Sequence, residues 1–192
     1  EDMQPLHPVG AGWGYSDSNY LVLGLIMEQI TGKTYYQLAE ERLLKPLKLK
    51  ATQKAISANL PTLTQGHIGS ANHFGLPTQT VTDGKYALNP KFEWCGGGFV
   101  TNTRDLAVWL HALHSGNVLA DNLHQELVQP VDFRSGKAAE QGYGLGSFVW
   151  STPHGTFWGH TGIMPGYLTQ IEYSQRHRFA IALQTNSDEG MG

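Results

Sequence analysis

The sequence predicts an α+β fold, with a mainly helical and loop region over residues 1–130 and a partial antiparallel sheet over residues 131–192. Apolar residues recur at helical spacing in the first region, whereas the second consists of short β-rich runs separated by Gly-containing or polar turns. The composition agrees, because 192 residues with 40% hydrophobic residues and 23 glycines suit one globular core with many tight turns. We therefore expect one domain over residues 1–192.

Two helices are predicted near the start of the chain. Apolar positions over residues 21–30 indicate a mostly buried helix that begins near Ser18 and ends at the Thr-Gly pair of residues 31–32, because glycine commonly follows a helix end. Residues 34–37, Thr-Tyr-Tyr-Gln, have the spacing of a capping box. A second helix should therefore begin there and end near Leu44, where a proline follows.

Residues 51–98 show little periodicity and many Thr, Gly, Pro and Asn, which is typical of a long irregular loop that often forms a binding-site wall. A third helix should begin at Thr103 and end at residues 115–116, and Asp121 should cap a fourth that ends at Pro130. The residues of the third helix expected to face inward are Leu106, Val108, Trp109, Leu110 and Leu113.

About four strands should follow, as consecutive antiparallel neighbours. They are Tyr143–Trp150, Thr156–Gly159, Tyr167–Tyr173 and Arg178–Gln184. The last of them contains an apolar run without alternation at residues 179–183, so we expect this strand to be central and covered on both faces.

Charge and composition exclude several classes of function. A net charge of −3 and the absence of a Lys/Arg run argue against a nucleic-acid partner. The longest apolar run, residues 20–27, is too short to span a bilayer. The single Cys95 excludes an internal disulfide and is better explained as a packed residue than as a reactive thiol. His111 and His114 have a spacing that can bind metal, but without a third ligand they are better explained as surface histidines, and we expect no metal or cofactor.

Two short motifs point to acyl-transfer chemistry. Residues 158–162, Trp-Gly-His-Thr-Gly, place a hydroxyl and a ring nitrogen beside flexible backbone, and residues 15–17 are Tyr-Ser-Asp. The motifs resemble those of the serine β-lactamase and D-alanyl-D-alanine carboxypeptidase superfamily, in the branch with class C β-lactamases, DD-peptidases and β-lactamase-like esterases. Residues 15–20 and the apolar helix behind them resemble the Tyr-x-Asn box, residues 96–106 resemble the Gly-Gly-x-x-Ser/Thr-Thr-x-x-Asp-Leu segment, and residues 160–162 match the third box, Lys-Thr-Gly or His-Thr-Gly.

The resemblance implies a role for each residue of these boxes. Tyr15 would shuttle a proton to and from an activated serine, and His160 would hold Tyr15 in its working form and help to anchor the substrate. Thr161 would offer a hydroxyl to a substrate carboxylate, Gly162 would let the acyl group lie close to the strand, and the backbone N–H of Ile163 would be one of two oxyanion donors. A tyrosine packed at a helix start and a structural histidine remain the alternatives.

Asp17 stands where the family more often has Asn. An ionised carboxylate only accepts hydrogen bonds and disfavours anionic substrates, so we expect a neutral ester or a peptide-like substrate ahead of a β-lactam. An Asp17→Asn variant that left the preference between anionic and neutral acyl substrates unchanged would contradict this hypothesis.

The nucleophile of the family is not found in these residues. No Ser or Thr in an apolar helix is followed three residues later by Lys, as the Ser-x-x-Lys element requires. We expect the chain to be the middle and later part of a larger hydrolase, truncated at both ends and inactive alone. The missing N-terminal segment or an oligomer partner should cover the exposed sheet. The resemblance favours a periplasmic or extracellular location, with the cytoplasm still open.

Two other interpretations remain. The chain could be a non-catalytic module that uses the inherited cleft to bind a peptide or to assemble. It could also be an unrelated α+β domain with coincidental motifs, which predicts that Tyr15 and His160 lie far apart.

Overall fold

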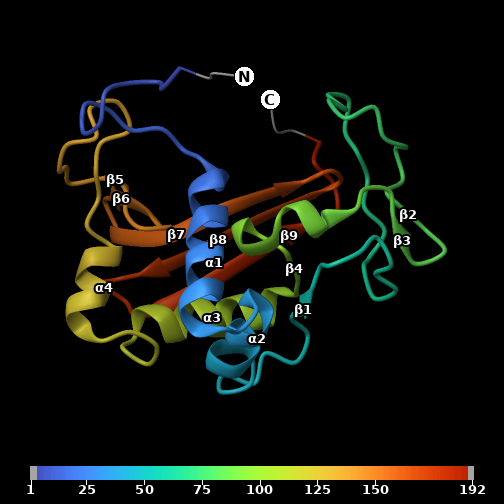
Figure 1. Ribbon diagram of the computed structural model, residues 1–192, viewed down its shortest axis with the longest axis horizontal. Helices are drawn as coiled ribbons and strands as arrows, with labels where there is room; N and C mark the ends of the chain where they lie inside the picture. Colours follow the sequence, from blue (N-terminus) through green and yellow to red (C-terminus); the bar gives the residue numbers. More distant parts are fainter. Residues whose placement is uncertain (1–3, 190–192) are drawn as a thin grey trace. The chain divides into compact units, whose positions relative to one another are not determined.

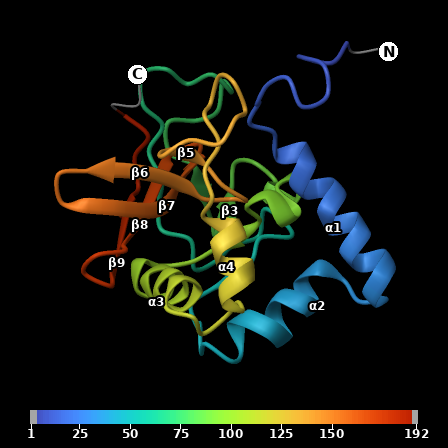
Figure 2. The ribbon, with the colours of Figure 1, turned by 90° about the vertical axis from the view of Figure 1, so that its left-hand side faces the viewer.

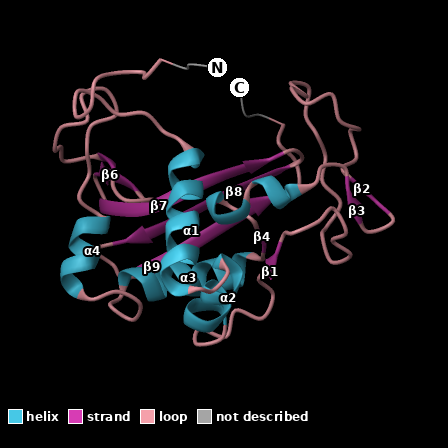
Figure 3. Cartoon of the chain, in the orientation of Figure 1, coloured by secondary structure: helices cyan, strands magenta, loops and turns pink. Residues whose placement is uncertain are grey.

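The computed structural model describes residues 4–189 of the chain (Figures 1 and 3). These residues form two compact units. Of the described residues, the first unit comprises residues 4–16, Leu110–His160 and Glu172–Ile181, and the second comprises Asp17–Trp109, Thr161–Ile171 and residues 182–189. Several elements therefore contribute residues to both units. Within the described part of the chain, no helix combines the length and the apolar character needed to cross a bilayer.

The helices are α1 (Asp17–Thr31), α2 (Tyr35–Ala39), α3 (Thr103–His114) and α4 (Asp121–Leu127), with the π-helical turn η1 (Glu40–Leu44) and the 3-10 turns η2 (Pro90–Phe92) and η3 (Trp94–Gly96). The strands are β1 (Gln53–Lys54), β2 (Val81–Thr82), β3 (Lys85–Tyr86), β4 (Phe99–Val100), β5 (Gly142–Tyr143), β6 (Phe148–Thr152), β7 (Gly155–Met164), β8 (Tyr167–Ser174) and β9 (Phe179–Thr185). Mixed helices and antiparallel strands confirm the predicted α+β class.

The main sheet has five strands in the order β5-β6-β7-β8-β9. The first predicted strand is interrupted, because the chain turns between β5 and β6 through Gly146, whose φ is +84°. The β6–β7 pair is antiparallel and lies side by side in Figure 2. Strand β7 is longer than predicted and contains the whole Trp-Gly-His-Thr-Gly motif of residues 158–162.

The predicted central position of the last strand is wrong. Strand β9 lies at the edge of the sheet, and Phe179, Ile181 and Leu183 are 41%, 44% and 62% exposed. An unbroken apolar run indicates that both faces favour burial, but it does not specify what covers them.

Helix α1 begins and ends as predicted, with Gly32 in the left-handed conformation after it. Its predicted burial is wrong, because Gly24 is its only buried residue and Leu25 and Ile30 are 60% and 78% exposed. Gly24 is required by packing. A Cβ there would lie 2.5 Å from Sγ of Cys95. The apolar spacing located the helix correctly, but the described residues cover only a small part of it.

The capping box at residues 34–37 is confirmed by both of its hydrogen bonds, and α2 continues through η1 to Leu44 (Figure 2). In α3, Val108 is 41% exposed and so does not face inward as predicted. Asp121 is the first residue of α4 and not its cap, since the N-cap is Ala120, which makes no side-chain cap. A cap needs extended backbone, and here that conformation falls one residue earlier.

Candidate active site

An aromatic cluster in the first unit brings together the two residues that the sequence singled out from opposite ends of the chain. The ring centroids of Tyr15 and His160 are 6.1 Å apart. Tyr143 lies against both, at 5.8 Å from each ring. Its hydroxyl is 2.9 Å from Nε2 of His160. The interpretation that the motifs are coincidental required distant rings and is therefore wrong.

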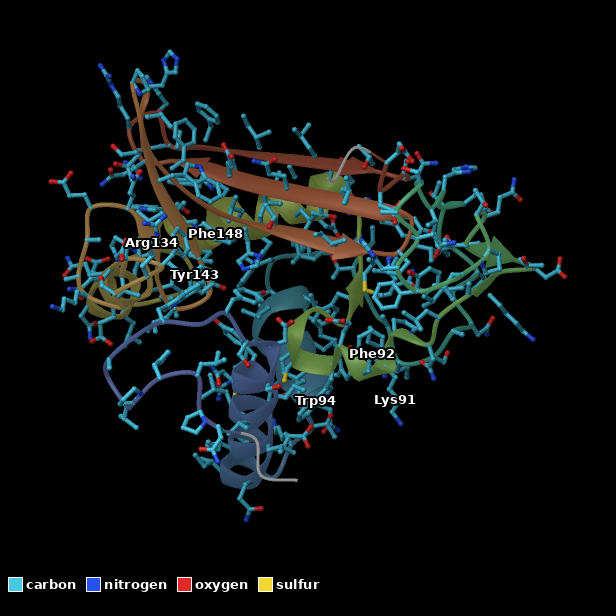
Figure 4. All side chains as sticks on the ribbon, turned by 90° about the horizontal axis from the view of Figure 1, so that it is seen from above. Lys91, Phe92, Trp94, Arg134, Tyr143 and Phe148 are labelled. Atoms are coloured by element: carbon cyan, nitrogen blue, oxygen red, sulfur yellow. The ribbon has the colours of Figure 1, made fainter. Side chains whose placement is uncertain are left out.

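Strand pairing explains how these rings meet. Tyr143 on β5 is paired with Phe148 on β6, and Phe148 is paired with Gly159, the residue before His160 on β7. The Phe148 ring packs at 4.9 Å from Tyr143 and 5.0 Å from His160, and Figure 4 shows Tyr143 and Phe148 as neighbours. The register of three strands thus sets the position of the imidazole.

The segment before α1 supplies the other wall of this cluster. Trp13 packs at 5.4 Å from Tyr143 and makes an edge contact with Phe133 at 5.1 Å. The two phenols differ in accessibility, since Tyr143 is 5% exposed and Tyr15 is 47% exposed. The phenol of Tyr15 is therefore open to solvent, whereas the phenol of Tyr143 is enclosed by its protein neighbours.

The three residues that follow His160 along β7 belong to the second unit. Thr161, Gly162 and Ile163 are all exposed, with Ile163 at 60%. A Cβ placed on Gly162 would meet its nearest neighbour, Cβ of Thr169, at 3.7 Å, which is an ordinary contact. Packing within the unit therefore does not require glycine there, and the open backbone leaves room for a ligand.

Asp17 is the exposed first residue of α1, in the second unit. It lies near Glu93, and an added Cβ on Gly96 would be 3.7 Å from Cβ of Asp17 and 3.8 Å from Oε2 of Glu93. Partial burial, together with the charge of Asp17, raises the pKa of the Glu93 carboxyl above its usual range. A second carboxyl group, which the sequence motif did not indicate, therefore lies near Asp17.

The second unit also contains an open cavity of about 640 Å³, and none of the predicted site residues line it. Its walls are Tyr36, Glu40, Leu44, Lys45, Lys48, Leu49, Lys50, Thr52, Gln53, Lys54, Ile56 and Phe99. The cavity is basic, and one of its lysines, Lys45, is paired with Glu40 at 2.9 Å. The catalytic motifs therefore do not coincide with this cavity.

The two histidines of α3 lie in different surroundings. His111 is exposed, as predicted, but His114 is buried and its Nδ1 is 2.9 Å from Nε2 of His124 on α4. In residues 4–189, no group of three or more His, Cys, Asp or Glu side chains is placed to hold a metal ion. Cys95 donates to the backbone oxygen of Tyr20 at 3.0 Å, and burial raises the pKa of its thiol, as suits a packed residue.

Comparison with known proteins identifies the family. The family model described as Beta-lactamase matches residues 1–192. The chain belongs to the beta-lactamase family. The predicted resemblance to the serine β-lactamase and D-alanyl-D-alanine carboxypeptidase superfamily is thereby confirmed at the level of the family.

Two curated relatives of this beta-lactamase-family chain carry different names. It is 24% identical to a D-aminopeptidase of Brucella anthropi over 94% of the chain and 33% of the relative. It is 23% identical to penicillin-binding protein 4* of Bacillus subtilis over 93% of the chain and 40% of the relative. The chain thus spans about a third of the length of the curated relatives that it matches.

Solved structures agree on the fold. A D-stereospecific amidohydrolase from Streptomyces sp. matches with a TM-score of 0.81 and 27% identity, over 97% of this chain and 54% of that one. A D-amino acid amidase from Ochrobactrum anthropi, complexed with L-phenylalanine amide, matches with a TM-score of 0.72 and 23% identity, over 93% and 51%. These likenesses confirm a beta-lactamase-like fold, part of which this chain forms.

Sequence reasoning missed Tyr143, although it placed this residue at the start of a strand. The sequence does contain a pattern that marks this position. Tyr143 is followed by Gly-Leu-Gly at residues 144–146, where a turn ends the strand. A phenol at such a strand end can turn toward the neighbouring strand.

Proposed function

We propose that this chain is part of a serine hydrolase that cleaves an amide or ester bond through an acyl-enzyme. The observation that carries this proposal is the adjacency of Tyr15 and His160 in a chain of the beta-lactamase family. In this proposal the exposed phenol of Tyr15 moves the proton of the attacking serine, and His160 holds that phenol in place.

The remaining motif residues would bind the acyl group in this mechanism. Thr161 would donate its hydroxyl to the substrate, and Gly162 would let the substrate backbone approach β7 without a steric clash. The backbone N–H of Ile163 would stabilise the tetrahedral oxyanion, which requires a donor about 3 Å from the oxygen. The exposure of all three residues supports these roles.

For the substrate, we propose a D-amino-acid amide or peptide, or a simple ester, ahead of an anionic β-lactam. Three of the similar proteins are named as a D-aminopeptidase, a D-amino acid amidase and a D-stereospecific amidohydrolase. The negative charge of Asp17, which also acts on Glu93, disfavours an anionic substrate. No cofactor enters this mechanism.

The test uses the complete protein that carries this chain, assayed with a D-amino-acid amide, a nitrophenyl ester and a β-lactam. A serine-directed reagent should abolish turnover. Tyr15→Phe should lower kcat by about 10²- to 10⁴-fold, because it removes a proton carrier. Tyr20→Phe is the matched control within the same motif and should leave kcat unchanged. Absence of turnover with all three substrates would contradict the proposal and favour a non-catalytic binding or assembly module.

We further propose that the 192 residues alone are catalytically silent, because they contain no Ser-x-x-Lys element in an apolar helix. In this proposal they form one partial domain, with the helical and loop region up to residue 130 and the sheet region from 131. The purified chain should not hydrolyse a chromogenic acyl ester. Turnover that a serine-directed reagent abolishes would contradict it.

We also propose that further polypeptide or an oligomer partner covers the apolar side chains of α1 in the functional protein. Val22, Leu25 and Ile30 are more than half exposed, and exposed apolar patches of this kind usually mark contact surfaces. Among the similar structures, a penicillin-binding protein homologue from Pyrococcus abyssi is described as octameric. Light scattering on the complete protein, compared with an Ile30→Glu variant, would show whether this face joins subunits.

A further inference from the structure

The bond between Tyr143 and His160 has a direction that chemistry can assign. A neutral imidazole has one nitrogen that donates and one that accepts, and a phenol can do either. A phenol O–H is in general a more acidic donor than the N–H of a neutral imidazole, and the unprotonated imidazole nitrogen is a far more basic acceptor than a phenol oxygen. At 2.9 Å, the favoured arrangement therefore has the Tyr143 O–H donating to Nε2 of His160.

We infer that Tyr143 is a positioning residue that fixes neutral His160 as the tautomer with its proton on Nδ1, so that Nε2 of His160 does not serve the reaction as a general base. The role of His160 in the reaction rests on the proposed function, whereas the assignment of its tautomer does not depend on that function. Because the lone pair of Nε2 accepts from Tyr143, the transfer of the serine proton falls to Tyr15.

The packing around Tyr143 supports a fixed geometry. The residue is 5% exposed, and its ring is held between Trp13 at 5.4 Å and Phe148 at 4.9 Å. Phe148 also contacts the imidazole at 5.0 Å, so the same phenylalanine restrains both partners. Tyr143 and Phe148 come from the paired strands β5 and β6, and Figure 4 shows the two side chains near each other. Side chains locked by packing hold a hydrogen bond in one geometry.

The arrangement also tolerates protonation of the imidazole. When His160 is cationic, Nε2–H donates and the oxygen of Tyr143 accepts, so the ring keeps its orientation in both charge states. Tyr143→Phe would keep the aromatic packing but remove the hydroxyl that bonds the imidazole in both charge states. It is therefore the informative substitution.

The test is an NMR measurement on the complete protein with ¹⁵N-labelled histidine, at a pH where the imidazole is neutral. His160 is assigned by difference with His160→Gln. In the native protein, Nε2 should give an unprotonated-type ¹⁵N signal and Nδ1 a protonated-type signal. In Tyr143→Phe, the two tautomers should mix and the Nε2 signal should move toward the protonated type.

Tyr86→Phe is the matched control, because Tyr86 is also 5% exposed and its hydroxyl donates to the backbone oxygen of Pro165 at 2.9 Å. This control should leave the His160 signals unchanged. A protonated Nε2 in the native protein would overturn the inference, even if Tyr143→Phe failed to fold. Unchanged His160 signals in folded Tyr143→Phe would also overturn it.

Kinetics separate the tautomer from its role. Tyr143→Phe should lower kcat at least tenfold with little change in KM, since it disturbs the position of His160 and not a substrate contact. An unchanged kcat in an active enzyme would overturn the positioning role. If the native protein hydrolyses nothing, the proposed function fails, and with it this role, whereas the NMR result still decides the tautomer.

Discussion

Acidification should destabilise the first unit through His114. This side chain is 7% exposed, its Nδ1 is 2.9 Å from Nε2 of His124, and its ring lies 5.1 Å from Trp158 and 5.3 Å from Tyr173. Burial, with a smaller contribution from the charge of His124, lowers the pKa of His114 to about 4. Its buried Nε2 has no hydrogen-bond partner among the described residues.

The sign follows from proton binding. The folded state resists protonation of His114, whereas the unfolded chain protonates near its ordinary pKa of about 6.5, so the unfolded state binds more protons between these values. Stability should therefore be full above about pH 6.5 and fall as the pH drops toward about 4. Between about pH 8 and pH 5 the two pKa values give a loss of roughly 2 kcal/mol, which partial solvation reduces to about 1–2 kcal/mol.

Urea unfolding at about pH 8 and about pH 5 measures this loss as a change in the free energy of unfolding. His114→Phe keeps an aromatic ring against Trp158 and Tyr173 and should remove most of the pH-dependent loss. His111→Gln changes an exposed histidine of the same helix and should retain it. If His114→Phe lost as much stability as the native protein between the two pH values, the assignment to His114 would be refuted.

Three substitutions in the second unit should change the free energy of unfolding, each measured by urea titration. Asp105→Ala removes a buried carboxylate that accepts from the backbone N–H of Ala51 at 2.8 Å and should cost about 2–4 kcal/mol. Gly24→Ala should cost about 1 kcal/mol despite the better helix propensity of alanine, and Cys95→Ala should partly restore it. Thr34→Ala breaks the capping box and should cost about 1 kcal/mol, and a neutral result would contradict the cap.

Local signals in the sequence predicted the elements well where their physical cause is local. Residues 34–37 carry both halves of a capping box, and α2 begins there. Gly32 and Gly116 follow α1 and α3 with positive φ, so both helix ends were readable. The interruption between β5 and β6 was not predicted, because Gly146 turns the chain inside a run that otherwise reads as one strand.

Burial was predicted less well because it depends on what lies opposite each face. The apolar spacing of α1 and the apolar run of β9 predicted coverage, yet Ile30 is 78% exposed and Leu183 is 62% exposed. The converse error occurred at His114, which sequence reasoning placed on the surface and which is buried beside His124. A side chain's own polarity does not say which element packs against it.

The candidate site was partly predictable for the same reason. Tyr15 and His160 belong to motifs that can be read along the chain, whereas Tyr143 acquires its role only through the strand pairing that brings its hydroxyl to His160. Burial then separates the two phenols. Tyr143 is 5% exposed and Tyr15 is 47% exposed, so in the proposed mechanism the proton transfer belongs to the accessible phenol of Tyr15. The buried phenol of Tyr143 contacts Nε2 of His160, and the inferred role of Tyr143 is therefore to orient the imidazole and not to transfer a proton.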